Sequence, residues 1–174
     1  MTRRAHADRT TALTAIYAKL PTIQCQGLCH DTCGPIQMTP TEHRRIQQRH
    51  GVSIPDRTIR DGAATCEALT ILKRCGVYPD RPLLCRLWGL LTIMPCTYGC
   101  KPDRYLSATE GYELLAQAYQ IDGDHQRAAQ FRAIAPPTLN PTQTAQLTTA
   151  LRAFIGGQAT AADTETRVRQ VHDG

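Results

Sequence analysis

The cysteines place the strongest constraint on how this chain can fold. All eight lie between Cys25 and Cys100 of the 174 residues, and the surrounding segment 21–106 holds eight of the eleven prolines. Aromatic residues make up only 5% of the chain, so loops of this kind have little apolar core in which to bury free thiols. The spacing is Cys25-x3-Cys29-x3-Cys33, then Cys66, Cys75 and Cys85, then Cys96-x3-Cys100.

The amino-terminal residues bear on the redox compartment that these thiols meet. The short amphipathic segment from Ala12 to Leu20 lacks the continuous apolar core of about 7–15 residues that a secretory signal has. No stretch of the chain approaches the roughly 18 apolar residues of a membrane span. We therefore expect a cytoplasmic protein with no membrane partner, in which clustered cysteines bind metal more often than they form disulfides. All eight cysteines are candidate ligands, and zinc, iron or a 4Fe-4S cluster is the expected cofactor.

The first three cysteines restrict the geometry of such a site. On a straight helix, residues four apart rise about 6 Å per step, so Cys25 and Cys33 would lie about 12 Å apart. Two sulfurs on one zinc ion lie within about 4 Å of each other. Either this segment is a loop, which Gly27 and Gly34 favour, or its cysteines serve different ions. The spacing matches neither a standard zinc ribbon nor a ferredoxin, so zinc and iron–sulfur both remain open.

Other functions find less support in the sequence. Buried structural thiols, a thiol–disulfide switch and an iron–sulfur redox or catalytic protein acting on a partner remain as alternatives. Eight thiolates on two divalent ions would lower the net charge from +5 to about +1, which weakens a case for nucleic-acid binding. We find no catalytic triad, phosphate loop or dinucleotide motif, and so no catalytic residues. His30, His43 and His50 are weaker metal ligands, the last two being expected on an exposed basic face with Arg44 and Arg45.

Part of the cysteine segment resembles a known family. Thr65-Cys66-Glu67-Ala68-Leu69, followed by Cys75-Gly76-Val77-Tyr78-Pro79-Asp80-Arg81-Pro82-Leu83-Leu84-Cys85-Arg86, is similar to the second half of the YkgJ-type cysteine-cluster family. The cysteines of 25–33 and the run Met38-Thr39-Pro40-Thr41-Glu42 match its first half. The family is described as a zinc- or iron-chelating domain, so the resemblance, over about residues 22–100, implies metal chelation and no agreed reaction. The family usually ends its first cluster in adjacent cysteines, whereas Gly34 follows Cys33 here, and Cys96 and Cys100 are candidates for the missing ligand.

The residues between Cys75 and Cys85 have a physical interpretation of their own. Pro79 and Pro82 fix φ on either side of a turn that would aim the two cysteines at a shared point. Arg81 and Arg86 would either donate to anionic thiolates or sulfides, or form surface ion pairs with nearby carboxylates. Tyr78 is expected in the core.

The remaining patterns predict helices. We expect a mostly α fold with irregular loops, in which a small metal-organised cysteine-rich domain precedes a helical hairpin and a tail that offers a surface to a protein partner. The expected segments are an N-terminal helix in 1–20, the cysteine-cluster domain 21–106, the hairpin 107–135, and a C-terminal helix and tail in 142–174. Capping boxes at Thr39 and Ser107 each place a glutamate three residues on and predict helix starts there. A short helix is expected from about 80–82, carrying Leu83, Leu84, Leu87 and Leu90. Gly51 is expected to end the helix that starts at Thr39, and Gly156-Gly157 to break the last helix. Pro136-Pro137 and Asn140-Pro141 are expected to form a linker.

Overall fold

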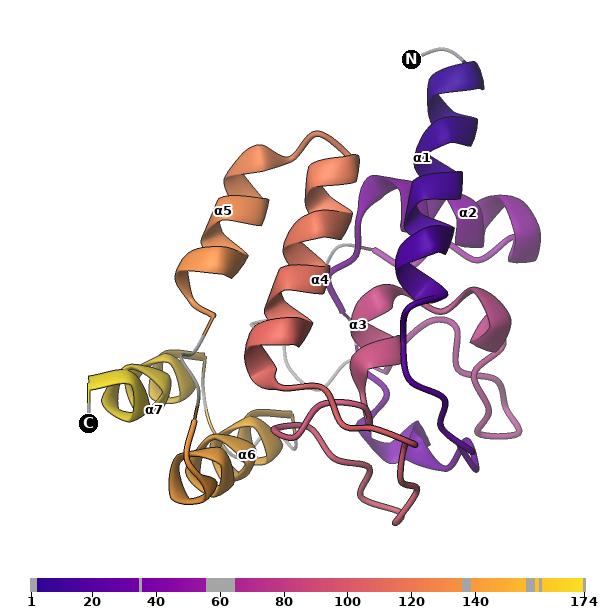
Figure 1. Ribbon diagram of the computed structural model, residues 1–174. Coiled ribbons are helices and arrows are strands. Elements are labelled where there is room, and N and C mark those ends of the chain that lie inside the picture. Colours follow the sequence, from indigo (N-terminus) through magenta and orange to yellow (C-terminus); the bar gives the residue numbers. More distant parts are fainter. Residues whose placement is uncertain are drawn as a thin grey trace.

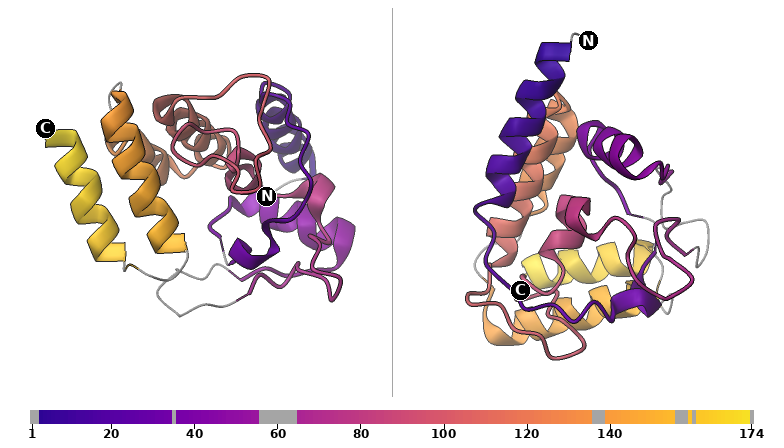
Figure 2. Two further views of the ribbon diagram at one scale, coloured as in Figure 1. Left: turned by 90° about the horizontal axis from the view of Figure 1, so that it is seen from below. Right: turned by 90° about the vertical axis from the view of Figure 1, so that its right-hand side faces the viewer.

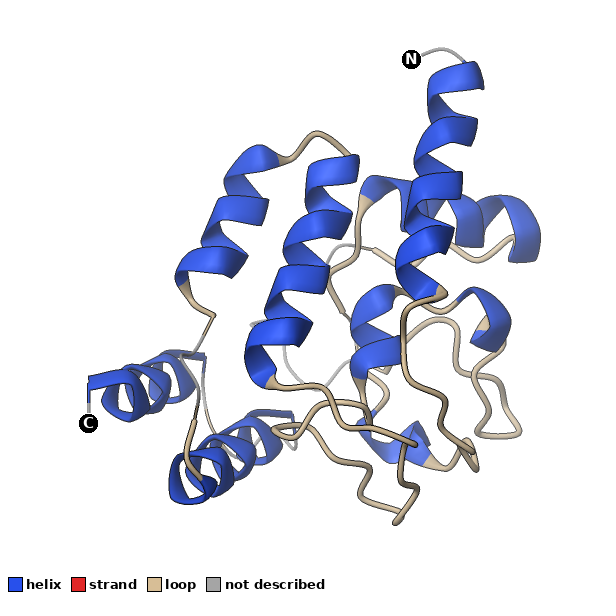
Figure 3. Ribbon diagram, in the orientation of Figure 1, coloured by secondary structure: helices blue, strands red, loops and turns tan. Residues whose placement is uncertain are grey.

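Helices form most of the structure, a computed structural model that describes residues 3–34, 36–55, 65–135, 139–155, 159 and 161–173 (Figures 1 and 3). The mostly α fold that the sequence predicts is confirmed. In chain order the elements are α1 (Arg3–Tyr17), the 3-10 turn η1 (Cys29–Thr32), α2 (Pro40–His50), the 3-10 turn η3 (Tyr78–Asp80), α3 (Leu83–Leu87), α4 (Ala108–Ile121), α5 (His125–Ala133), α6 (Pro141–Ile155) and α7 (Ala161–Asp173). No helix in these ranges has both the length and the apolar character needed to cross a bilayer.

Both predicted capping boxes are confirmed. The Thr39 side chain accepts a hydrogen bond from the Glu42 N–H, while Glu42 accepts one from the Thr39 N–H at 2.8 Å. Ser107 and Glu110 make the same reciprocal pair at the start of α4. These bonds satisfy backbone N–H groups that have no partner within the helix. At the other end of α2, Gly51 adopts a left-handed φ of 67° and stops the helix, as the sequence predicts.

Other helix boundaries differ from the predictions. The first helix ends at Tyr17 and not at Leu20, while α6 starts at Pro141, which we expected in a linker. Proline suits the first position of a helix because its missing N–H would have no partner there. The expected linker at Pro136-Pro137 and the expected break at Gly156-Gly157 fall outside the described residues. The tail beyond them forms α7.

A single large apolar core joins the helices. It contains buried leucines from every expected segment: Leu13 from α1, Leu87 from α3, Leu115 from α4 and Leu147 from α6. Helix α4 packs against both α1 and α5, and Figure 1 shows it standing between them. The predicted segments therefore share one core, although their compositions differ sharply at residue 106.

A smaller cluster lies under the cysteine-bearing loops. Its buried members are Ile46, Ile54, Cys66, Ala68 and Val77, with Cys33 and Cys75 packed at its edge. The left view of Figure 2 shows α6 and α7 side by side at one end of the molecule and the loop of residues 65–80 at the other. Three cysteines from two separate stretches of sequence are thus part of one packed cluster.

Candidate metal centre

The turn before Cys85 is held by a buried carboxylate. Asp80 accepts hydrogen bonds from Arg49 at 2.8 Å and from the His50 Nε2 at 2.9 Å, and the Arg45 Nε lies 3.4 Å from it. Burial would raise the pKa of this carboxyl, but the hydrogen bond from His50 and the charges of Arg49 and Arg45 lower it below its usual value. The exposed basic face predicted for α2 is therefore wrong at Arg45, which is 6% exposed, and at His50, which is paired with Asp80.

A second buried carboxylate joins three helices. Glu42, only 2% exposed, accepts hydrogen bonds from the Tyr17 hydroxyl and from the Leu83 N–H, each at 2.6 Å. Burial and the neighbouring Glu42 charge together raise the pKa of Tyr17. The guanidinium groups of Arg45 and Arg86 lie 4.8 Å and 4.3 Å from the centre of the Tyr17 ring. This network anchors the start of α3 to α1 and α2, and so determines where Cys85 lies.

The two arginines of the turn have different roles. Arg86 donates to the main-chain oxygens of Arg81 at 2.9 Å and of Pro79 at 2.5 Å, so its guanidinium stabilises the turn itself. Arg81 lies over the Tyr78 ring at 4.2 Å. Burial would raise the pKa of the Cys25 thiol, but Tyr78, the Gly27 N–H and the Arg81 charge lower it below its usual value. Of the two predicted thiolate donors, Arg81 is the one that the structure places at a thiol.

Tyr78 is not the core residue that we expected. Tyr78 is 37% exposed, and it contributes to the lowered pKa of the Cys25 thiol. Its position between Cys75 and Cys85, three residues before Arg81, could have indicated a place near the thiols. Its aromatic character alone predicted burial in the core.

Hydrogen bonds of the main chain bring Cys33, Cys66 and Cys75 together. The Cys66 N–H donates to the Cys33 oxygen at 3.0 Å, which joins the end of η1 to the loop that follows residue 64. That loop then folds back on itself, with Leu69 and Cys75 paired in an antiparallel bridge. The predicted loop character of the first cysteine segment is confirmed, since η1 is one short 3-10 turn between bends.

We call Cys33, Cys66, Cys75 and Cys85 the inner thiol group. The interaction between the thiols of Cys33 and Cys66 raises the pKa of Cys33 and lowers that of Cys66. Burial raises the pKa of Cys85, and the charges of Cys66 and Cys75 raise it further. Burial, followed by the Cys66 charge, raises the pKa of Cys75 as well. A thiolate in this group therefore raises the pKa of a neighbouring thiol. A cation bound among them would instead lower the pKa of each thiol.

The main chain already supports the charged form of several thiols. The Gly27 N–H donates to the Cys25 sulfur at 3.3 Å. The Ala68 N–H contributes to the lowered pKa of Cys66, and the Val77 N–H opposes the rise that burial causes in the pKa of Cys75. In all three cases the donor lies two residues after the cysteine. Donors of this kind orient a ligand and stabilise its negative charge, as the second layer of a metal site does.

We call Cys25, Cys29 and Cys96 the outer thiol group. Burial raises the pKa of the Cys29 thiol, and the charges of Cys25 and Cys96 add to the rise. The loops that carry them are tied together by the Tyr98 hydroxyl, which donates to Asp31 at 2.6 Å. The eighth cysteine, Cys100, is 8% exposed and lies in the same loop as Cys96. The sequence predicted eight ligands without dividing them, and the structure separates an inner from an outer group.

The thiols are neighbours rather than a converged set of ligands. All eight cysteines are free, and no three Cys, His, Asp or Glu side chains in the described ranges are arranged to hold an ion as they are oriented. The inner thiol group nevertheless fits zinc or iron by its chemistry, because four soft sulfur donors with N–H support are what such ions take.

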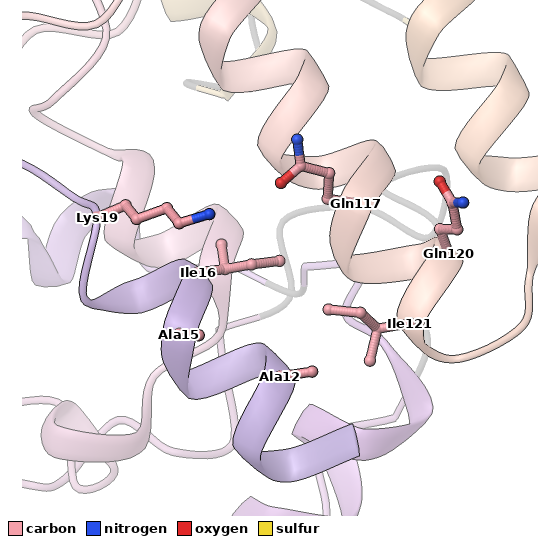
Figure 4. Close-up of a pocket in the computed structure, with 7 residues that line it drawn as sticks. All are labelled: Ala12, Ala15, Ile16, Lys19, Gln117, Gln120 and Ile121. Atoms are coloured by element: carbon pink, nitrogen blue, oxygen red, sulfur yellow. The ribbon is translucent and has the colours of Figure 1, made fainter. Parts of the chain in front are cut away.

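A groove elsewhere has a different character. It encloses about 460 Å³ between α1 and α4, and Figure 4 shows its lining, which is made of small, aliphatic and amide side chains with Lys19 at one end. The residues that line it are Ala12, Ala15, Ile16, Lys19, Gln117, Gln120 and Ile121. This lining contains no cysteine, histidine or carboxylate, unlike the loops that carry the thiols.

Comparisons with known proteins add no relative to this picture. No protein-family model, no curated protein and no solved structure matches the chain. The resemblance of residues 65–86 to the YkgJ-type family therefore stays a prediction.

Proposed function

We propose that this protein binds a metal ion through the inner thiol group, with zinc or iron as the cofactor. The observation that carries the proposal is the mutual effect of Cys33, Cys66, Cys75 and Cys85 on one another's ionisation, although they come from η1, a folded-back loop and α3. The resemblance to a chelating family supports the same role. The proposal places the protein in the reducing cytoplasm, where free thiols persist.

Binding would convert thiols into thiolates. Each ligand releases a proton, so the raised pKa values of Cys33, Cys75 and Cys85 make metal affinity increase with pH. Four thiolates and one divalent ion carry a net charge of about −2. The N–H donors of Ala68 and Val77 and the nearby Arg81 charge, which acts on both Cys75 and Cys85, offset part of it.

The proposed role of the ion is to cross-link loops. A site with four protein ligands is closed to substrate and is typical of structural zinc. An iron–sulfur cluster bound by the same thiols would instead supply electron transfer. Because no group of catalytic residues accompanies the thiols in the sequence, we assign no reaction.

One observation favours a second candidate, a thiol–disulfide switch. Cys33 and Cys66 pack in one cluster, the Cys66 N–H donates to the Cys33 oxygen at 3.0 Å, and the interaction of the two thiols moves their pKa values in opposite directions. Oxidation by a small disulfide such as oxidised glutathione would form an S–S bond, with the two protons and two electrons leaving in two molecules of reduced thiol. This switch requires the same two thiols to be free of metal, so metal content distinguishes the two functions.

The test is elemental analysis with an absorption spectrum of protein purified without air. We expect one ion in the inner group of the wild type, its loss in Cys85→Ser, and its retention in Cys100→Ala, a buried cysteine outside the inner group. Because Cys85→Ser alters a buried site, Cys85→His provides a variant that keeps a ligand. In cobalt-loaded protein it should retain the ion with a shifted spectrum. A wild type that binds neither its native metal nor Co²⁺ would refute the proposal and favour the switch.

A further inference from the structure

We propose that the loop between Cys66 and Cys75 contacts an anionic membrane surface, with two aliphatic side chains at its end inserted among the lipid head groups. We call these two residues, Ile71 and Leu72, the apolar tip. The inference goes beyond the proposed function and does not rest on it, because it uses the exposed end of the loop and not the thiols at its base. The expectation of no membrane partner rested on the lack of a spanning stretch, which a contact of this kind does not need.

The apolar tip carries the most exposed large apolar side chains that the structure describes. Ile71 is 98% exposed and Leu72 is 79% exposed, whereas Ile134, the next in order, is 48% exposed. Single exposed aliphatic residues are common on protein surfaces, but here two adjacent ones project together. Leaving both in water forgoes the free energy that burial would supply, so the pair indicates an apolar environment outside the chain.

Hydrogen bonds hold the apolar tip at the end of a tight hairpin. The Thr70 N–H donates to the Arg74 oxygen and the Lys73 N–H donates to the Thr70 oxygen, each at 2.9 Å. Below this turn, Leu69 and Cys75 pair in an antiparallel bridge. The apolar tip therefore forms the two central residues of a fixed turn. A segment that is already ordered loses little conformational entropy when it contacts a surface.

Two exposed basic residues, Lys73 and Arg74, directly follow the apolar tip. The Arg74 guanidinium donates to the main-chain oxygens of Gln26 at 2.6 Å and of Gly27 at 3.1 Å. These bonds tie the hairpin to the neighbouring loop and keep the Arg74 charge at the surface. Basic side chains next to inserted apolar ones lie at the level of the head groups, where anionic lipids attract them. The charge beside the apolar tip is therefore complementary to an anionic lipid layer.

The backbone at Lys73 gives a separate indication that its side chain has a role. Its φ is +56°, the one positive φ outside glycine among the described residues. Glycine adopts this conformation without the strain that a side chain causes. A lysine at this position therefore costs stability and supplies a charge beside the apolar tip. Strain of this kind is typical of positions where a side chain serves binding.

The small size of the apolar tip favours a lipid layer over a protein partner or a second copy of this chain. A stable protein interface buries about 800 Å² on each partner, around an apolar centre. The exposed residues that flank the apolar tip on its N-terminal side, Thr65, Glu67 and Thr70, are all polar. A lipid surface needs only a few inserted side chains with positive charge beside them.

The experiment measures cosedimentation of the full chain, purified without air, with vesicles of phosphatidylcholine that either contain or lack phosphatidylserine. We expect binding to the vesicles with phosphatidylserine, weaker binding to those without it, and weaker binding as the salt concentration rises. The double substitution Ile71→Ser with Leu72→Ser should weaken binding by at least about tenfold, because burial of one aliphatic side chain is worth a tenfold change in affinity or more. Ile134→Ser removes an exposed aliphatic side chain at the end of α5 and should leave binding unchanged.

Lys73→Gly separates the charge at the apolar tip from the fold of the hairpin. The substitution relieves the strained φ, so the free energy of unfolding should equal or exceed that of the wild type. Binding to vesicles with phosphatidylserine should nevertheless fall about fivefold, which is the effect of one basic residue at an anionic surface.

Several results would overturn the inference. These are binding to neither kind of vesicle, equal binding to both kinds, and binding that survives the double substitution. A dimer in the absence of vesicles that the double substitution converts to a monomer would also overturn it, since the apolar tip would then join two copies of the chain. Metal content measured on the same samples keeps the two proposals apart, because vesicle binding by protein that takes up no metal would refute only the proposed function.

Discussion

The helical part of the molecule and its cysteine-bearing loops are held together in different ways. In the helical part, leucines from α1, α3, α4 and α6 fill one large core, and Leu13, Leu87 and Leu147 are at most 2% exposed. The loop of residues 65–80 contributes only to the small cluster, and its tip exposes Ile71 at 98% and Leu72 at 79%. Burying one such side chain contributes about 1.5–3 kcal/mol, so apolar burial can support the helices but not these loops. This difference is the reason for proposing that a metal ion bound by the thiols cross-links the loops.

Between the two parts lie two buried carboxylates, Asp80 in ion pairs and Glu42 in hydrogen bonds. Asp80 and Glu42 connect α2 to the turn before α3 and to α1, and neither carboxylate is at the surface. Buried charged groups of this kind contribute mainly by fixing the relative positions of the elements that they join. A different arrangement of these elements would remove a partner and leave a buried charge unpaired. They make the position of Cys85 depend on helices far from it in the sequence.

Removal of the metal should have the largest effect and should separate the two parts. Apparent binding free energies of structural zinc reach about 10–16 kcal/mol, and this energy would stabilise the loops in particular. Hydrogen exchange measured with and without a chelator should show lost protection in residues 65–76 and retained protection in α4. A uniform loss over both regions would contradict the division.

Asp80→Asn should have the next largest effect, since it leaves Arg45 buried without its ion pair. Breaking such a pair costs about 3–5 kcal/mol, measurable by urea unfolding. The pKa of Asp80 is lowered in the folded state, so its contribution is complete above the unfolded pKa of about 3.9. That contribution is lost as pH falls through the folded pKa. The variant should therefore be less sensitive to acid than the wild type.

Glu113→Gln is the matched control for this prediction. Glu113 pairs with Arg132 at 3.0 Å, but both side chains are 43% exposed. Exposed pairs contribute about 0–1 kcal/mol. Equal losses of stability in the two variants would show that Asp80 is not the buried anchor described above.

Leu13→Ala should weaken the helical part without affecting the thiols. The side chain is 1% exposed in the large core, and large-to-small changes there cost about 2–5 kcal/mol. At a temperature where the variant is still folded, its metal content should equal that of the wild type. Loss of metal in the folded variant would contradict the separate stabilisation of the two parts, because it would show that the metal-binding loops depend on the helical core.

Local patterns in the sequence were enough to predict most of the helices. The capping boxes at Thr39 and Ser107 and the stop at Gly51 depend on neighbouring residues only, and each lies where it was expected. The predictions for Arg45, His50 and Tyr78 were wrong for the opposite reason. Their partners are 28 or more residues away in the chain, as with Arg45 and Tyr17, or belong to other loops.

The sequence by itself determined that eight thiols lie within one loop-rich segment and that helices follow it. Only the tertiary structure decided how those thiols are divided, because Cys33, Cys66, Cys75 and Cys85 meet through the folding back of one loop and the anchoring of α3. Spacing along a chain limits which residues can meet within one turn or helix. Which distant residues do meet depends on buried partners such as Asp80 and Glu42, and these act only once the helices have packed.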